Sequence, residues 1–451
     1  MKYLGFAAAS ILLLVIIWFW DASPPTVNWI GPEFLGEGSE LGLTVQDEGR
    51  GLRTILVEVR QNGNFETVFS RVYARSWLPW QQRPVREEIV IDAKNLREKA
   101  SLQEGEFEVA VTVADQANLW IFKRQVVDVR ALTLDLTPPR IEVLSSQHYL
   151  RQGGSEAVIY RVSEGDGASG VRVGNRVFSG FPLAGQPEGT HVCLFALPYD
   201  ESPDAPIVAW AEDPAGNRSE TGFWIKTFPR EFRQRRIEVS DRLIEEIAPE
   251  ILSHTKDIEP GQTPRETFLA INSELRTITQ ERIDEITSTS NASRLWNEPF
   301  QQLSNSQVES SFADRRSYYY DGEKIDQQTH LGFDLASLAR SLVEAANGGE
   351  VVFADYLGIY GNCVILDHGL GLFSLYGHLS SIDVKNGQSV SKGQTLGRTG
   401  TTGLAVGDHL HFSILLRGVQ VTPLEWWDPK WVREHVLQRM EGATEPTSNA
   451  R

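Results

Sequence analysis

Cysteine is scarce in this chain: only Cys193 and Cys363 occur among 451 residues. At most one disulfide bond can therefore form, and its two residues lie far apart in sequence, in what we interpret as different domains. An oxidising compartment would permit that bond, but an unpaired cysteine usually behaves as a small buried apolar residue. We expect two buried free thiols.

Basic residues are in deficit as well. The chain has 43 Lys and Arg against 60 Asp and Glu, which gives a formal net charge of -17 at pH 7. Nucleic-acid binding needs a positive surface that neutralises phosphates. The composition therefore argues against a nucleic-acid partner, and against a nuclease as the explanation of any metal site.

One N-terminal run lacks charge altogether. Leu4 to Trp20 contains no charged residue, with Lys2 before it and Asp21 after it. At about 1.5 Å per residue a helix of this length spans roughly 25 Å, close to the ~30 Å hydrocarbon core of a bilayer. Bulky residues, WFW, stand where signal peptidase prefers small ones. For residues 1–25 we favour an uncleaved anchor in the inner membrane over a cleaved signal segment, with the rest of the chain in the periplasm.

Two stretches after this segment read as β modules. Residues 26–134 and 135–228 each begin near a proline-containing motif, DASPP or DLTPP, followed by an alternating strand, TVNWI or RIEVL. Short alternating strands separated by turn residues are typical of immunoglobulin-like sandwiches. We predict two such modules, which either bind glycan or a partner or act as spacers, and we favour the spacer.

Between residues 229 and 298 the apolar period becomes helical. Ser240 fits an N-cap, and Thr263, Pro264 and Glu266 fit an N-cap, a first-turn proline and a capping-box acid. This pattern predicts a helical connector with an apolar stripe. The stripe is expected to form a hairpin of its own, to dock on a neighbouring domain or to dimerise; a regulatory version would cover an active-site groove.

Histidine is also rare, with nine residues, yet two of them stand two positions apart in GDHLHFS, residues 407–413. Leu410 and Phe412 alternate with His409 and His411, which predicts a strand with both imidazoles on one face. An isolated His-x-His more often marks half-exposed strand residues than a functional site. Other polar residues must decide its meaning.

The segment THLGFDLA, residues 329–336, supplies such residues. His330, Gly332 and Asp334 are separated by even steps, so in an extended chain they share a face; in a helical turn His330 and Asp334 would also be neighbours. Gly332 disfavours the helix and would leave space between the imidazole and the carboxylate for a bound ion. Either geometry brings His330 and Asp334 together.

These side chains suit a catalytic metal. A catalytic zinc typically takes three protein ligands and keeps a fourth position for water or substrate. His330, Asp334 and one histidine of the 409/411 pair supply three ligands, and His378, in SLYGHLSS, is a further candidate. The residues predict a zinc site without deciding which histidine of the pair is the ligand.

The three motifs together resemble the zinc metallopeptidases of the lysostaphin and LytM type, which cut peptide bonds in bacterial peptidoglycan. The resemblance is carried by H-x-G-x-D at 330–334, Y-G-H-L at 376–379 and H-L-H-F at 409–412. It runs from about Pro299 to Leu424, and the glycine and lysine-glycine spacings between the motifs are similar to that family as well.

Carried over position by position, the resemblance implies that His330, Asp334 and His411 bind Zn²⁺ and that His378 and His409 are catalytic. The ion would polarise the scissile carbonyl and lower the pKa of its bound water toward ~7. The two catalytic histidines would orient that water, transfer its proton and stabilise the oxyanion.

One position departs from the family pattern. Members often carry an acid directly after H-L-H-F, where this chain has Ser413. If that acid orients a ligand, metal affinity or rate would differ here. Nearby, Tyr376 and Tyr318 to Tyr320 are more often packing residues than a substrate groove, and His368 is expected in a hairpin turn.

The predicted fold class is mostly β and multidomain. In chain order it comprises a membrane segment (1–25), two immunoglobulin-like modules (26–134 and 135–228), a helical connector (229–298), an all-β LytM-type peptidase domain (299–425), and a C-terminal helix with a disordered tail (426–451).

The resemblance implies a zinc endopeptidase acting on peptidoglycan crosslinks or stem peptides in cell-wall remodelling. Two alternatives stay open: a non-catalytic LytM-type regulator of another hydrolase, which the complete ligand set disfavours, and an enzyme whose connector blocks the groove until a partner protein moves it. The sequence does not specify that partner, the oligomeric state or the scissile bond, whether D-alanyl to diaminopimelate or in a glycine-rich bridge.

Overall fold

The computed structural model describes residues 24–49, 51–75, 84–116, 125–163 and 167–442. The predicted membrane segment lies outside these residues except for its last two positions, and the predicted disordered tail beyond residue 442 lies outside them too. Within the described part of the chain, no helix combines the length and apolar character needed to cross a bilayer. The chain divides into two compact units, Met1–Pro139 with Glu212–Ser219, and Arg140–Ala211 with Glu220–Arg451.

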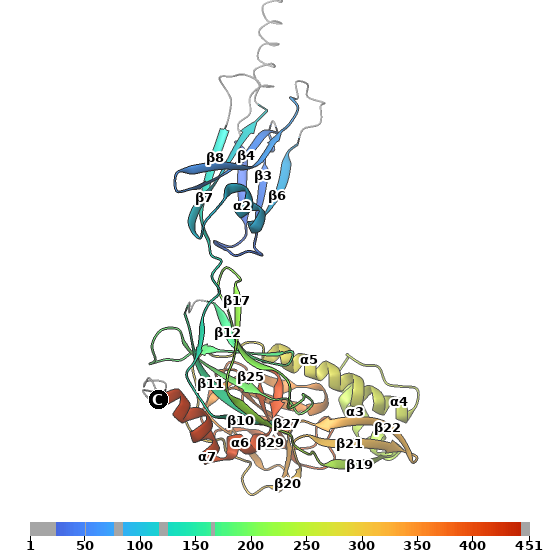
Figure 1. Cartoon of the computed structure of the whole chain (residues 1–451). Helices are drawn as coiled ribbons and strands as arrows, with labels where there is room; N and C mark the ends of the chain where they lie inside the picture. Colours follow the sequence, from blue (N-terminus) through green and yellow to red (C-terminus); the bar gives the residue numbers. More distant parts are fainter. Residues whose placement is uncertain (1–23, 50, 76–83, 117–124, 164–166, 443–451) are drawn as a thin grey trace, which may run out of the picture. The chain divides into compact units, whose positions relative to one another are not determined.

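The first unit consists of two sheets over one apolar core (Figure 1). One sheet has the order β1 (Thr26–Ile30), β3 (Glu40–Gln46), β6 (Arg86–Asp92). The other has the order β2 (Phe34–Leu35), β8 (Gln125–Leu134), β7 (Gly105–Asp115), β4 (Leu52–Gln61), β5 (Asn64–Val72), and α2 (Ala93–Ala100) follows β6. The predicted strand TVNWI is β1, while the immunoglobulin-like assignment of the unit stays a prediction.

The second unit begins with further short sheets. One has the order β14 (Phe181–Pro182), β15 (Thr190–Ala196), β11 (Ser155–Val162), β9 (Ile141–Val143). Another has the order β13 (Arg176–Ser179), β12 (Ala168–Val173), β16 (Ile207–Glu212), β17 (Arg218–Gly222), and β10 (His148–Arg151) pairs in parallel with β18 (Ile225–Phe228). Their buried residues share one continuous core with the sheet that carries the histidine motifs.

That sheet has ten strands and is mostly antiparallel. Its main path runs β20 (Gln307–Ser310), β23 (Phe333–Ala336), β30 (Leu410–Leu416), β27 (Leu372–Ile382), β26 (Asn362–Asp367), β25 (Gly349–Tyr356), β28 (Ser389–Val390). Beside this path, β29 (Thr395–Thr399) pairs with β27 and β24 (Leu342–Glu344), and β31 (Val419–Val421) pairs with β30; a short 3-10 turn, η3 (Gly358–Tyr360), precedes β26.

The segment predicted to be a helical connector begins with a strand, which corrects that prediction in part. β19 (Gln234–Val239) pairs in parallel with β21 (Asp314–Tyr320), which pairs with β22 (Glu323–His330). Helices follow: α3 (Asp241–His254), α4 (Pro264–Leu269), the π-helical η2 (Ala270–Leu275) and α5 (Arg276–Ile286). The predicted N-cap at Ser240 and the capping box of Thr263 and Glu266 are confirmed.

These helices dock on the ten-stranded sheet, which is one of the outcomes left open by the sequence. Phe268, Ile271, Leu275 and Ile283 pack in one core with buried residues of β25, β26, β27 and β30. Ile283 is fully buried in this core, whereas Ile278 and Ile286 are only partly buried against it. The π-turn of η2 shifts the apolar face relative to a regular α-helical period.

The C-terminal segment is helical, as predicted, and joins two parts of the second unit. It comprises α6 (Pro423–Trp427), α7 (Pro429–Trp431), the π-helical η4 (Val432–Leu437) and α8 (Gln438–Gly442). Trp426 donates from Nε1 to Ser155 Oγ at 3.0 Å, and Arg439 lies 3.0 Å from the fully buried carboxylate of Glu156. The two cysteines are buried and free, as expected from the sequence.

Candidate metal centre and active site

The histidine motifs meet because their strands are neighbours. In β30, His411 lies directly opposite Asp334 of β23 on one side and Gly377 of β27 on the other. His330 ends β22, and the chain leaves that strand at Leu331 before entering β23. His330 and Asp334 therefore stand on two strands rather than on the single extended segment that their spacing suggested.

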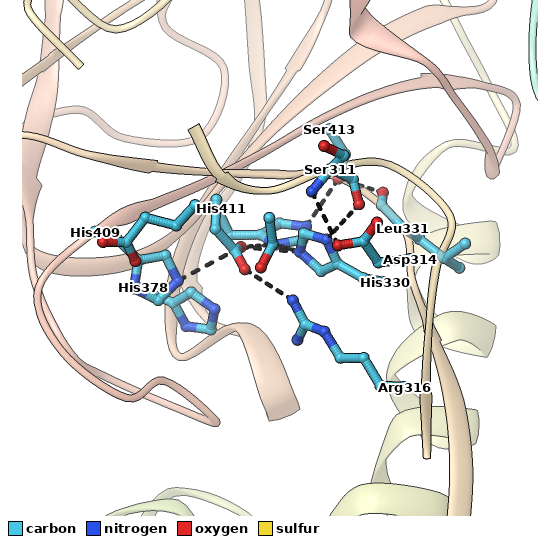
Figure 2. A network of polar contacts seen from close by, with 12 residues as sticks. Ser311, Asp314, Arg316, His330, Leu331, His378, His409, His411 and Ser413 are labelled. Atoms are coloured by element: carbon cyan, nitrogen blue, oxygen red, sulfur yellow. Dashed lines mark hydrogen bonds and ion pairs between the residues drawn. The ribbon is translucent and has the colours of Figure 1, made fainter. Parts of the chain in front are cut away.

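Three donor atoms converge at this point (Figure 2). His330 Nε2 lies 2.9 Å from Asp334 Oδ1 and 3.1 Å from His411 Nδ1, and the same oxygen lies 3.1 Å from His411 Nδ1. A tetrahedral metal with bonds of about 2.0 Å separates its ligand atoms by about 3.3 Å. The triangle formed by these three atoms therefore has the size that such an ion requires.

The remaining ring nitrogens fix the tautomers of both histidines. His330 Nδ1 lies 3.0 Å from the carbonyl oxygen of Ser311, which can only accept a hydrogen bond. His411 Nε2 lies 3.0 Å from Ser413 Oγ, whose hydroxyl donates to the carbonyl oxygen of Leu331 at 2.8 Å. Both histidines thus carry their proton away from Asp334 and turn an unprotonated nitrogen toward it, as metal ligands require.

Gly332 has a different role from the one predicted. The sequence suggested that its missing side chain leaves room for an ion between His330 and Asp334. A Cβ at this position would lie 2.4 Å from His411 Nε2 and 2.6 Å from Ser413 Oγ. The space therefore accommodates the His411 ring and its hydroxyl partner, because the turn between β22 and β23 passes directly over them.

His378 and His409 lie beside this triangle, with ring centroids 4.8 Å apart. His378 Nδ1 donates to the carbonyl oxygen of Thr402 at 2.8 Å, and His409 Nδ1 donates to that of Gly407 at 2.9 Å. The Nε2 atoms of both rings are therefore available for proton exchange, and His409 Nε2 lies 3.5 Å from Asp334 Oδ1. His378 has a φ of 61°, a left-handed conformation that non-glycine residues adopt mainly where a site demands it.

Burial and neighbouring charges shift the pKa values of His378, His409 and His411 in different directions. Burial lowers the pKa of His378 well below its usual range, with the charges of His409 and His411 adding to the effect. Burial also lowers the pKa of His411 to about 4. Burial acts in the same direction on His409, but the hydrogen bond and charge of Asp334 outweigh it and raise its pKa.

Asp334 stays ionised although it is buried. Burial by itself raises its pKa, but close contacts with the imidazoles of His330, His409 and His411 outweigh burial and hold the pKa well below the usual range. Its second oxygen, Oδ2, accepts a hydrogen bond from Arg316 Nη2 at 3.0 Å. No sequence pattern pointed to Arg316, because it lies in β21, outside every motif.

A cavity of about 550 Å³ opens over these residues. Its lining includes the five predicted site residues, His330, Asp334, His378, His409 and His411. Leu243, Ile247, Phe268 and Arg276 of the helical segment form part of its wall, as does Tyr318 of β21. The connector therefore contributes directly to the site, which sequence patterns did not reveal.

The connector also supports the loop that holds His378. The carboxylate of Glu250, in α3, accepts hydrogen bonds from Gly403 N and from the Tyr356 hydroxyl, each at 3.0 Å. Gly403 follows Thr402, whose carbonyl oxygen fixes the His378 ring. Glu250 thus restrains the backbone that orients a catalytic candidate on another element.

Tyr376 and His368 have structural positions, in line with the sequence interpretation. Tyr376 is buried and its hydroxyl accepts from Ala346 N at 2.8 Å. His368 follows β26 in the turn before β27, with its ring bonded to Gly348 O and Ser374 Oγ. The other four histidines, His148, His191, His254 and His435, line no part of the metal-site cavity among the described residues.

Three buried donors in a tight triangle, with fixed tautomers and an ionised carboxylate, fit a divalent metal ion. Among the described residues, His330, Asp334 and His411 are the group of metal-ligating side chains whose ligand atoms all lie within 4.8 Å of one another. Two histidines and one carboxylate leave a tetrahedral ion one position for water or substrate.

The region that contains these residues is similar to a known protein family. The family model "Peptidase family M23" matches residues 328–423. The peptidoglycan DD-endopeptidase ShyA of Vibrio cholerae is 38% identical over 96 residues, 21% of this chain and 22% of that protein. The DD-carboxypeptidase/endopeptidase Mpg of Neisseria meningitidis is 36% identical over 95 residues, 21% of this chain and 22% of that protein.

The curated relatives are thus matched over about a fifth of their own length. Among solved structures, the catalytic domain of lysostaphin from Staphylococcus simulans is 25% identical, with a TM-score of 0.25, over 29% of this chain and 98% of that chain. The matched segment contains every one of the five predicted site residues. This chain carries a C-terminal peptidase domain of family M23, the lysostaphin and LytM type of metallopeptidase.

Proposed function

We propose that the protein is a zinc-dependent endopeptidase that hydrolyses peptide bonds of peptidoglycan. The observation that carries this proposal is the complete buried set of His330, Asp334 and His411, with two further histidines directed into the same cavity. The similarity to the peptidoglycan DD-endopeptidase ShyA and to the DD-carboxypeptidase/endopeptidase Mpg supports the choice of substrate. The uncharged run Leu4 to Trp20 supports anchoring in the inner membrane, with the peptidase domain in the periplasm.

His330, Asp334 and His411 would hold Zn²⁺, which supplies a Lewis acid for the scissile carbonyl and a nucleophilic water near neutral pH. The protein's own contribution is positional. His378 and His409 each use Nδ1 for a backbone carbonyl and line the cavity, which leaves Nε2 of each ring for proton exchange. The lowered pKa of His378 keeps it neutral and able to accept a proton, whereas the raised pKa of His409 favours a protonated ring that donates to a developing oxyanion.

The test is digestion of purified, crosslinked sacculi by the full-length protein, with the released fragments identified by mass spectrometry. Release of uncrosslinked peptides by the parent and not by His411→Ala would support the endopeptidase and identify its bond. If neither protein releases peptides while the parent binds zinc, a different substrate or a blocked groove explains the site. If neither releases peptides and neither binds zinc, the non-catalytic regulator takes precedence.

A further inference from the structure

The cavity over the metal site is rich in positive charge, although the protein as a whole is acidic. Three guanidinium groups line it, those of Arg235, Arg276 and Arg316, against the carboxylates of Glu309 and Asp334. Asp334 is a candidate metal ligand, so its charge is directed at the ion. The chain as a whole carries a formal net charge of -17. A local excess of positive charge in so acidic a protein indicates an anionic ligand rather than a general surface property.

Two of these arginines are held by neutral partners. Arg276, in α5, donates to the carbonyl oxygen and the Oδ1 of Asn272, each at 3.1 Å. Arg235, in β19, donates to Ser310 Oγ at 2.7 Å. Neither forms an ion pair with an acidic side chain of the described residues. Their positions are fixed by hydrogen bonds, while their charges stay uncompensated.

Arg316 links this charge to the reacting centre. It donates from Nη2 to Asp334, yet its Nε is buried without a hydrogen-bond partner among the described residues. A buried N–H that lacks a partner is costly, and an oxygen of a bound anion would satisfy it. Figure 2 shows the Arg316 side chain extending toward the cluster of labelled histidines.

Arg276 approaches the metal site from the helical side of the cavity, at the start of α5. It lines the cavity together with Tyr360. The Tyr360 ring stands 5.0 Å from the ring of His411, centroid to centroid. Arg276 is thus within electrostatic reach of the metal site, although it belongs to a helix outside the segment matched to family M23.

We propose that the arginine cluster, defined as Arg235, Arg276 and Arg316, binds a free carboxylate of the peptide substrate next to the scissile bond. Guanidinium groups recognise carboxylates through paired hydrogen bonds, so the cluster selects peptides that carry this group over amidated ones. The apolar wall formed by Leu243, Ile247 and Phe268 excludes water from that interaction and strengthens it. This inference rests on the proposed function and adds the chemical class that the site selects.

The test uses one crosslinked stem-peptide dimer prepared in two forms, with the carboxylate beside the scissile bond either free or amidated. Full-length parent, Arg276→Gln and Arg282→Gln are compared. Arg282 is an exposed arginine on the same helix that does not line the cavity, and it is therefore the matched control. We expect the free form to have a KM about tenfold to hundredfold lower in the parent, an advantage lost in Arg276→Gln and kept in Arg282→Gln.

Binding to the metal-stripped full-length proteins, measured by calorimetry, separates the two proposals because it does not need turnover. Hydrolysis of both forms with equal KM and equal affinity would overturn the carboxylate site and leave the endopeptidase intact. Tighter binding of the free form without any hydrolysis would retain the carboxylate site and overturn the endopeptidase. Neither hydrolysis nor a difference in binding would overturn both.

Discussion

Two regions line the same cavity: the strands β22, β23, β27 and β30, which carry the candidate metal ligands and His378, and the helical segment from α3 to α5. They contribute residues of different kinds. The strands carry side chains whose types and spacings are dictated by metal chemistry. The helices carry an apolar stripe and a few polar residues that any docked helix could have. The metal-binding chemistry therefore lies in the strands, whereas the shape and charge of the cavity also depend on the helices.

The largest effects are expected from removing, one at a time, the two histidines of the pair His409 and His411. We expect His411→Ala to lose bound metal and all activity, because it removes one of three ligands. His409→Ala is expected to keep the metal and lose about 10²- to 10⁴-fold in rate, as the loss of a general acid or base does. Metal content by mass spectrometry and sacculus digestion measure the two effects. Loss of metal from both variants would make His409 a ligand and remove the distinction.

The helical segment is expected to stabilise the fold rather than merely block the groove. Leu275→Ala should lower the free energy of unfolding by about 2–5 kcal/mol, because Leu275 is buried against the peptidase sheet. Ile278→Ala, at a partly buried position on the same helical run, should cost less. Denaturant unfolding measures both.

A second measurement on these two variants addresses autoinhibition. If the helices only covered the site, loosening them with Leu275→Ala would raise the rate of peptide hydrolysis. We expect the rate to fall or stay unchanged, since the same helices supply cavity residues. A rate above that of the parent would favour the blocked-groove alternative.

Replacing the hydroxyl behind His411 probes the support of the metal site. Ser413→Ala removes the acceptor of the His411 Nε2 proton, so the ring loses the contact that fixes its tautomer. Loss of such a partner typically lowers metal affinity about 10- to 100-fold. Chelator competition measures the change. Unchanged affinity would show that strand geometry alone orients the ring.

The smallest effect is expected from the contact that joins the two regions. Glu250→Ala removes the acceptor for Gly403 N, next to the residue that holds His378. We expect kcat to fall about threefold to tenfold with little change in KM, because an acceptor worth about 1 kcal/mol is lost far from the substrate. Glu246→Ala, an exposed acid on the same helix, is the control. Equal kcat and KM values for the two variants would show that Glu250 does not position His378.

Local pattern was sufficient for much of the molecule. Alternation around His411 predicted β30, and the capping residues Ser240 and Thr263 marked the starts of α3 and α4. These features depend on neighbours within a few residues in sequence. The strand β19 and the π-turn η2 were missed, since β19 is stabilised by pairing with β21 far along the chain and η2 by packing on the sheet.

The sequence by itself determined which side chains could bind a metal, because imidazole and carboxylate chemistry is a property of residue type and motif spacing. Only the tertiary structure decided that Ser413 and Ser311 fix the histidine tautomers, that Arg316 reaches Asp334, and that a helical segment completes the cavity. Apart from the pair His411 and Ser413, which share β30, these contacts join residues from different elements. Their geometry is set by strand pairing and helix docking, which depend on the whole core and leave no signature in a short stretch of sequence.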